Sequence, residues 1–478
     1  MAYGKEQTVT KTQLQFMFPF SLKKNFNSNL IQLLFQLDYE FFHLKNKGQE
    51  DRFYGRNHVS HRNLGKFFLP NIENILFPLS PQDEQGLRRM TKNINLDGEF
   101  QSSHVETSFH IPSVDIIICP YQIGLMNLRV NIPGGMALSE VLEFVSEFRS
   151  MEPLQKNDSV REIRHGGKSY KKMMDFIFGS ICPPLRDYLE EQDRNTSYFG
   201  SLPFFVDERM YVIGYYQLKE EDRLGDKELF RIGHLYGFNK DGAPYTGANS
   251  KDYLRDFYKS HVYERWADET HYVVSDYTFS CVTRCPDDDL KKELGDNMYG
   301  IHYYSILYYF FYKVVLMKLS YEQAEINLGK GQKHIEELIL KITTFSAKYY
   351  FHEVNTSTVG KEIYQLVKQV FHIEQLYTHV AGTLNNLYKN HDKLISKRHN
   401  YLLQLLTVYT VISGIYGMNL AIPDFEKGMD WSRLAEYNLL EWIALIVTFS
   451  GITLGIILGI SFLIAWYKEK RKDESNFF

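Results

Sequence analysis

Two uncharged, apolar segments near the C-terminus constrain this 478-residue chain more than any other feature. Tyr401 to Met418 contains no Asp, Glu, Lys or Arg. As a helix it would be about 27 Å long, a minimal crossing of a hydrocarbon core of about 30 Å. Trp442 to Tyr467 is also uncharged, and a helix of about 39 Å can cross with tilt. The pattern predicts transmembrane helices at 401–418 and 442–467.

The charges that flank these segments predict their orientation. Basic residues precede the first segment and follow the second, at Lys389, Lys393, Lys397, Arg398, Lys468, Lys470, Arg471 and Lys472. Acidic residues outnumber basic ones in the loop between the segments, 419–441. Because Lys and Arg concentrate on the cytoplasmic side, this loop is expected to be external. We therefore predict a multi-pass protein of the cell membrane, with both termini cytoplasmic and a basic cytoplasmic tail at 468–478.

The first 300 residues mix strand-like and helix-like patterns. Val114–Cys119 and Leu125–Ile132 are typical of strands, and Phe204–Leu218 is typical of a hairpin that turns at Asp207-Glu208. Ala137–Met151 carries apolar residues at helical spacing. These patterns predict a cytoplasmic mixed α/β domain over 1–300.

The following segment is expected to be helical. Ile301–Leu319 is apolar enough to be taken for a membrane span, but a charged Lys313 near its middle would be costly in lipid. We therefore interpret 301–319 as a buried helix, within a helical part of the cytoplasmic domain at 301–357. From Thr358 onward, apolar residues three and four apart predict one stalk helix at 358–400 that runs into the first span. The predicted fold is an α/β cytoplasmic domain, a long stalk helix and two transmembrane α-helices.

Composition and motifs argue against several classes of protein. A net charge of -4 and a pI near 6.5 give no reason to expect nucleic-acid binding. The four cysteines are too scattered for a disulfide framework, and buried thiols fit them better than zinc binding. His165-Gly166-Gly167-Lys168-Ser169 ends like a phosphate-binding loop, but Glu162 replaces its first glycine. With no catalytic motif present, we predict neither an enzyme nor an organic cofactor.

Polar and small residues gather on one side of the first apolar segment. At 100° per residue this side holds Asn400, Gln404, Thr407, Thr410 and Gly414, with Leu403 and Val411 among them. The stripe consists of Asn400, Leu403, Thr407, Thr410 and Gly414, with Gln404 at its edge. Polar groups left in lipid cost free energy, so this stripe is expected to meet water or protein. A ring of several copies around a pore and simple packing between helices both satisfy that requirement.

The stripe ends at Gly417-Met418-Asn419, and here the sequence resembles the CorA family of divalent-cation channels. The resemblance rests on Gly-Met-Asn closing the first of two C-terminal spans, a short acidic loop, a basic tail and a long preceding helix, over residues 358–472. It implies a homopentamer with a funnel-shaped cytoplasmic domain. It also implies a selectivity filter at Gly417, Met418 and Asn419, below which the stripe would line the pore.

The resemblance implies Mg²⁺ as the transported and regulatory ion. Neutral oxygens can hold hydrated Mg²⁺, which loses its water reluctantly. Thr407 stands where the family often has a bulky apolar gate residue. The family's Met-Pro-Glu-Leu is absent from the loop, whose acids Asp424, Glu426 and Asp430 could concentrate cations at the mouth.

Three consecutive aspartates are a further candidate site in the predicted cytoplasmic domain. Asp287, Asp288 and Asp289 follow Pro286 and could bind a regulatory cation, although acids after a proline more often open a helix. The expected function is Mg²⁺ uptake driven by the membrane potential, by a homo-oligomer in a lipid bilayer. The alternatives are a Zn²⁺, Co²⁺ or Ni²⁺ transporter of the same family, and a membrane-anchored sensor or binding protein whose hairpin is only a tether.

Overall fold

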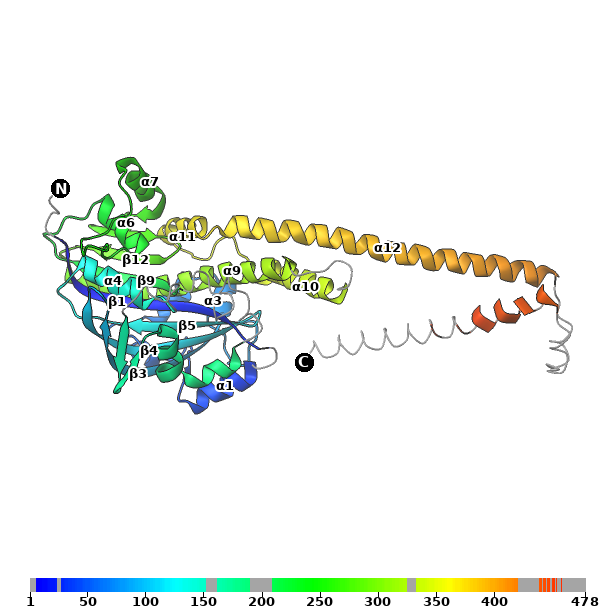
Figure 1. Cartoon of the computed structure of the whole chain (residues 1–478), viewed down its shortest axis with the longest axis horizontal. Coiled ribbons are helices and arrows are strands. Elements are labelled where there is room, and N and C mark those ends of the chain that lie inside the picture. Colours follow the sequence, from blue (N-terminus) through cyan, green and yellow to red (C-terminus); the bar gives the residue numbers. More distant parts are fainter. Residues whose placement is uncertain are drawn as a thin grey trace. The chain divides into compact units, whose positions relative to one another are not determined.

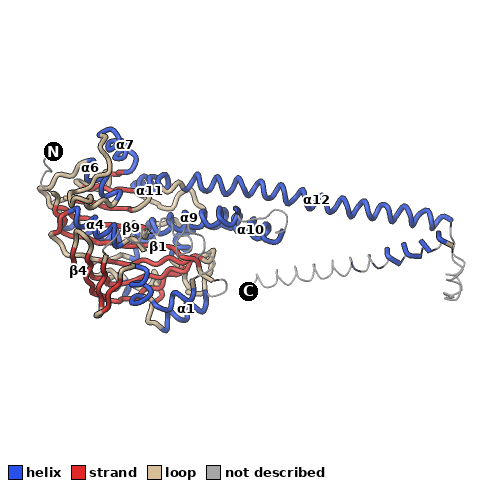
Figure 2. Tube along the Cα trace, in the orientation of Figure 1, coloured by secondary structure: helices blue, strands red, loops and turns tan. Residues whose placement is uncertain are grey.

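The computed structural model describes residues 6–23, 27–151, 161–189, 209–324 and 332–419 and, in short stretches, 438–457. The chain divides into two compact units, 1–384 and 385–478. The first unit contains all the described strands and is shown in Figures 1 and 2.

A single 12-stranded sheet organises the first unit (Figure 2). Its strands follow the order β10-β11-β12-β9-β1-β5-β4-β3-β7-β8, with β2 paired to β3 and β6 paired to β1. The parallel pair β9–β12 stands out, because the other strand pairings of the described sheet are antiparallel. The strands are β1 (Thr8–Ser21), β2 (Glu40–Phe41), β3 (Arg88–Gln101), β4 (Glu106–Cys119), β5 (Ile123–Val130), β6 (Met136–Ala137), β7 (Glu162–His165), β8 (Lys168–Tyr170), β9 (Tyr211–Leu218), β10 (Val262–Tyr263), β11 (Thr270–Val274) and β12 (Thr278–Thr283).

Helices connect and cover the strands of the first unit, and the last one continues into the second unit. They are α1 (Asn27–Gln36), η1 (Lys47–Gln49), α2 (His61–Phe67), α3 (Pro70–Leu76), α4 (Leu138–Phe148), α5 (Met173–Phe176), the π-helix η2 (Ile177–Ile181), η3 (Pro183–Tyr188), α6 (Asp226–His234), α7 (Lys251–His261), α8 (Asp288–Tyr299), α9 (Ile301–Ala324), α10 (Gln332–Lys348), α11 (Thr358–Val370) and α12 (Ile373–Asn419). The described residues from 439 to 457 are also helical.

One face of the sheet packs against the aromatic side of α4. Alternate residues of a strand point to opposite faces, so Phe16 and Phe100 lie on the α4 side of β1 and β3. The ring of Phe16 is 4.8 Å from that of Phe148, and the ring of Phe100 is 5.0 Å from that of Phe144. All four side chains are fully buried, and this contact forms the centre of the larger core.

The opposite face of the sheet packs against α8 and α9. The amide of Gln15 on β1 donates to the carbonyl of Met298 at 2.8 Å, and the hydroxyl of Tyr303 on α9 donates to Asp115 on β4 at 2.9 Å. Helix α9 is buried along most of its length. The sheet is thus the middle layer of the first unit.

Several expectations from the sequence are confirmed. The strand expected at 114–119 is part of β4, the strand expected at 125–132 overlaps β5, which ends at Val130, and the helix expected at 137–151 contains α4. Ile301–Leu319 belongs to the buried helix α9, where Lys313 reaches Asp276 at 3.0 Å. Of the hairpin expected at 204–218, the second half is β9, and residues 204–208 lie outside the described residues. The first 300 residues are mixed α/β.

The interpretation of the cysteines as buried thiols is confirmed as well. Cys119, Cys182, Cys281 and Cys285 are free, buried thiols. Burial raises the pKa of the Cys281 thiol to about 12, so this group stays protonated at neutral pH. Gly166 and Gly167 form the tight turn of the β7–β8 hairpin, with φ of 55° and 74°. Positive φ at both residues is the geometry that a two-residue hairpin turn requires.

The helix expected from Thr358 onward is broken. Helix α11 ends at Val370, and α12 starts at Ile373 after His372 has turned into the left-handed region at φ 54°. A left-handed residue stops the i to i−4 hydrogen-bond series, so the chain enters α12 in a new direction. Ile363 and Ile373, two of the regularly spaced apolar residues of the expected stalk helix, are buried within the first unit. In this part the regularly spaced apolar residues pack on their own domain.

The predicted fold class is wrong. In the part of the chain that the structure describes, no helix combines the length and the apolar character needed to cross a membrane. That finding overturns the expected architecture of an α/β domain with a stalk, two transmembrane helices and a pentameric funnel. What the described residues form is a mixed α/β fold around the 12-stranded sheet, followed by the long α12. Polar residues interrupt the apolar run in α12 at Gln404, Thr407 and Thr410, which lowers its mean hydropathy.

Candidate functional site

The Gly-Met-Asn sequence forms the C-terminal end of α12. Gly417, Met418 and Asn419 are the last three residues of this helix, and only their backbone is described. The structure thus places these three residues on helical backbone, at the point where the described part of α12 ends.

The polar stripe lies on the side of α12 away from its neighbouring helical segment. In the second unit, the hydroxyls of Tyr409 and Ser450 form a hydrogen bond of 3.2 Å, which marks the side of α12 that faces Ser450. At 100° per residue, the stripe residues lie between about 100° and 180° around the helix from Tyr409. All five are exposed, namely Asn400, Leu403, Thr407, Thr410 and Gly414. The stripe is thus brought together on one uncovered face.

The two threonine hydroxyls of the stripe are bonded to their own helix. Thr407 donates to the carbonyl of Leu403 at 2.7 Å, and Thr410 donates to the carbonyl of Leu406 at 2.8 Å. Such bonds to the preceding turn satisfy a hydroxyl without water or a partner side chain. Because their hydroxyl protons are already bonded, Thr407 and Thr410 cost less free energy in an apolar environment than unbonded threonines would. Their hydroxyl oxygens can still accept hydrogen bonds.

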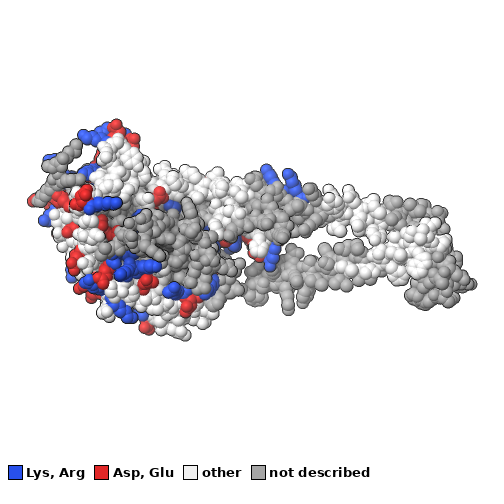
Figure 3. Space-filling view, viewed as in Figure 1, with Lys and Arg blue, Asp and Glu red and all other residues white. Residues whose placement is uncertain are grey.

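Large apolar side chains are exposed around the same part of α12. Their exposed fractions are 47 to 69%, for Tyr401, Leu402, Leu403, Leu405, Leu406 and Val408. Further exposed apolar residues follow in the second helical segment, including Leu439, Ile446 and Phe449. In Figure 3 the described atoms of this part of α12 are white, whereas both signs of charge are spread over the visible face of the first unit. Contiguous apolar surface of this kind marks a site of contact with lipid or protein.

The predicted acidic sites have different outcomes. Asp424, Glu426 and Asp430 of the expected external loop lie outside the described residues. Asp287 caps α8, since its carboxylate accepts from the backbone N–H groups of Asp289 at 2.9 Å and Leu290 at 3.3 Å. Asp288 pairs with Lys291 at 2.9 Å. Across the described ranges, no group of three or more His, Cys, Asp or Glu side chains is placed to hold a metal ion. Residues 287–289 thus act here as a helix start.

A buried charge network lies between the sheet and α9, and no pattern in the sequence indicated it. The carboxylate of Asp115 forms ion pairs with Arg129 at 2.6 Å and with Arg89 at 3.1 Å. The three side chains are at most 1% exposed. Burial by itself would raise the pKa of Asp115, but Arg129 and Arg89 outweigh burial and hold this pKa well below its usual range. The carboxylate therefore stays ionised inside the core.

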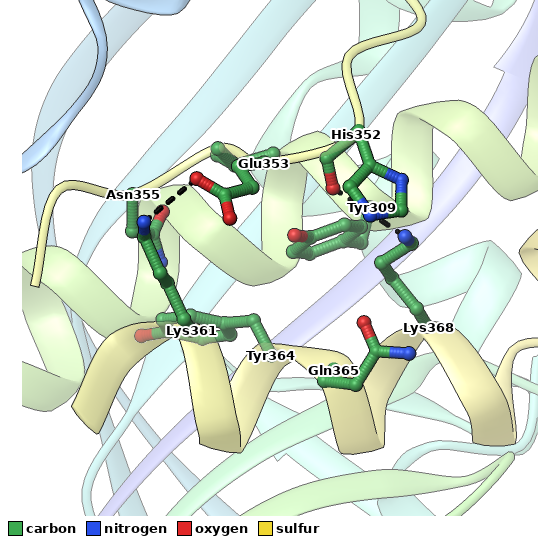
Figure 4. Close-up of a pocket in the computed structure, with 9 residues that line it drawn as sticks. Tyr309, His352, Glu353, Asn355, Lys361, Tyr364, Gln365 and Lys368 are labelled. Atoms are coloured by element: carbon green, nitrogen blue, oxygen red, sulfur yellow. Dashed lines mark hydrogen bonds and ion pairs between the residues drawn. The ribbon is translucent and has the colours of Figure 1, made fainter. Parts of the chain in front are cut away.

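A small polar cleft in the first unit was also missed. It has a volume of about 70 Å³ and lies between α9, α11 and the segment 352–355 that precedes α11 (Figure 4). Lys361 and Lys368 reach it from α11, Asn355 from the preceding segment and Tyr309 from α9. These residues are scattered over 60 positions of sequence without a motif, so only the folded structure brings them together.

Comparison with known proteins adds no family. No protein-family model, no curated protein and no solved structure matches this chain.

Proposed function

We propose that several copies of this chain together move divalent cations across a lipid bilayer, with Mg²⁺ as the preferred ion. The observation that carries the proposal is the uncovered stripe of α12, which leads to Gly417-Met418-Asn419 and is surrounded by exposed apolar side chains. The sequence resemblance to CorA channels points to the same residues.

The chemistry of the stripe supports passage of a hydrated cation. Its oxygen atoms belong to hydroxyl, amide and backbone carbonyl groups, and it carries no charge from Asn400 to Asn419. Neutral oxygens bind the water shell of Mg²⁺ without removing it, and they release the ion again. Moving two charges inward down 100 mV yields roughly 4.6 kcal/mol, so the membrane potential suffices as driving force.

The surroundings of the stripe support association with lipid and with other copies. The large apolar side chains between residues 401 and 408 form an exposed apolar surface, which indicates contact with lipid or with protein. Lipid or further copies of α12 would cover them. A single stripe cannot enclose an ion, and hence the proposal requires a homo-oligomer.

Ion flux into liposomes tests the proposal. Purified protein is reconstituted with a Mg²⁺-sensitive dye inside the vesicles, and uptake is started with an inward potential. We expect Asn419→Ala to lower the initial rate at least tenfold while the protein still reconstitutes. Ser413→Ala, an exposed position outside the stripe on the same helix, should transport like the unmodified protein.

Three outcomes separate the alternatives. Full transport by Asn419→Ala would remove the filter assignment. Stronger uptake of Zn²⁺, Co²⁺ or Ni²⁺ in a competition assay would change the ion. No flux of any divalent ion under any gradient would overturn the transport proposal and favour a membrane-anchored sensor or binding protein.

A further inference from the structure

The cleft beside α11 has the composition of a binding site. Lys361 and Lys368 are seven residues apart, two helical turns, so both side chains lie on one side of α11 (Figure 4). Tyr309 and Tyr364 form an aromatic base, with ring centroids 6.1 Å apart and nearly parallel planes. A volume of about 70 Å³ admits a group of a few heavy atoms and excludes a large ligand.

Lys368 brings a buried positive charge to the cleft. The residue is 2% exposed, and its ammonium group donates to the carbonyl of His352 at 3.4 Å and to Glu374 at 3.1 Å. An ammonium group has three N–H donors, so one donor has no partner among the described residues. Glu374 forms an ion pair with this ammonium group but is itself 55% exposed, so an oxyanion can bond the remaining donor.

Asn355 contributes an amide group that lacks any partner. The residue is 1% exposed, and neither its Oδ1 nor its Nδ2 has a hydrogen-bond partner in the described structure. Its backbone is held in place, since Leu69 donates to Val354 at 3.2 Å and Thr356 donates to Phe67 at 2.9 Å. These backbone hydrogen bonds of the two neighbouring residues hold the segment that carries the side chain. A buried unpaired amide costs free energy, which a ligand with both an acceptor and a donor would recover.

We propose that this cleft binds a small oxyanion that keeps a hydroxyl group, for which inorganic phosphate is the simplest example. Lys368 and Lys361 would supply the positive charge. Asn355 would donate through Nδ2 to an anionic oxygen and accept through Oδ1 from the phosphate hydroxyl. The site is independent of ion transport by α12.

Glu353 does not block this role. It pairs with Lys361 at 2.7 Å, but the two side chains are 49% and 43% exposed. Exposed ion pairs contribute little free energy, so Glu353 can turn to solvent while the anion takes its place at Lys361. The bound anion would then bridge Lys361 and Lys368.

Titration calorimetry on the full-length protein tests this site, with inorganic phosphate as the probe and sulfate at equal ionic strength as the comparison. Sulfate has the same shape and charge class but no hydroxyl at neutral pH, so Asn355 Oδ1 would remain unpaired. We expect phosphate to bind at least tenfold more tightly than sulfate. Equal binding of the two ions, or no binding of phosphate, overturns the proposal.

Matched variants locate the site. Lys361→Gln, at an exposed position, should weaken phosphate binding about tenfold, whereas Lys348→Gln on the exposed side of α10 should not change it. Asn355→Leu should abolish the preference for phosphate over sulfate and leave the melting temperature without phosphate at least as high, because it removes two unpaired polar atoms. Unchanged phosphate binding in both Lys361→Gln and Asn355→Leu would place the anion elsewhere and overturn the assignment.

Discussion

Asp115 is the residue on which the centre of the fold depends most. Its carboxylate lies between two guanidinium groups, from Arg89 and Arg129, and it also accepts from Tyr303. Removing the one negative charge would leave two buried positive charges without compensation. The loss of one partner from a buried ion pair typically costs about 3–5 kcal/mol.

We expect Asp115→Asn to lower the free energy of unfolding by about 3–5 kcal/mol, measured as a shift of the urea midpoint. Asp97→Asn is the control, because Asp97 pairs with His110 at 2.7 Å but is 85% exposed. An exposed pair of this kind is worth less than about 1 kcal/mol. Equal effects of the two substitutions would contradict the role of Asp115.

The same residue predicts a dependence on pH. The pKa of Asp115 is held below its unfolded value, so its stabilising contribution is complete above pH of about 4 and is lost as pH falls toward the folded value. Asp115→Asn should therefore lose less stability than the unmodified protein between pH 5 and pH 2.

At the scale of elements, the junction of α11 and α12 controls the direction of the chain. His372 occupies the left-handed region with an exposed side chain, a conformation that costs an L-residue about 1 kcal/mol and a glycine almost nothing. We expect His372→Gly to raise the free energy of unfolding by up to about 1 kcal/mol.

The control substitution for this junction is expected to change the free energy of unfolding in the opposite direction. His379→Gly lies at an exposed position inside α12 and should lower stability by about 0.5 kcal/mol, because glycine is a poor helix former. Denaturant titrations of both variants measure the difference. A loss of stability in His372→Gly would contradict the left-handed conformation of residue 372.

The elements also show which patterns in the sequence were informative. The strand at 114–119 was predictable because a run of Ile is typical of a buried strand. The buried helix at 301–319 was predictable because Lys313 near its middle argues against a membrane span. The break at His372 was not, since no glycine or proline near this position marks the end of a helix in the sequence. The network around Asp115 was hidden for a similar reason, because polar residues in a strand are expected to face water.

The candidate site was predictable only in part. The spacing of Asn400, Thr407 and Thr410 correctly placed them on one exposed face of a helix. It could not show that the threonines bond to their own helix, which depends on side-chain rotamers. The cleft residues Asn355 and Lys368 are ordinary in sequence, and their importance arises from burial that distant segments impose.

At the scale of the whole molecule, the exposed apolar part of α12 predicts association. Leu406 is 62% exposed, and we expect Leu406→Glu to reduce both flotation with liposomes and the size of the particle in mild detergent. A charge at a buried apolar contact is costly. Leu340→Glu is the control, because Leu340 on α10 is 67% exposed in the first unit and no role is assigned to it. If the two variants behave alike, residues 401–408 are not a contact surface.

The position of β1 in the sheet has a consequence for how the protein is made. This strand pairs with β5 on one side and with β9 on the other, and β9 begins only at Tyr211. At translation rates of about 5–20 residues per second, roughly 4–16 s pass between the emergence of Val130 and that of Tyr211. During that interval the growing polypeptide carries a long unpaired strand edge, which readily joins neighbouring chains on a polysome. The edge of β1 that β9 later covers is therefore open to other partners until the second half of the sheet has left the ribosome.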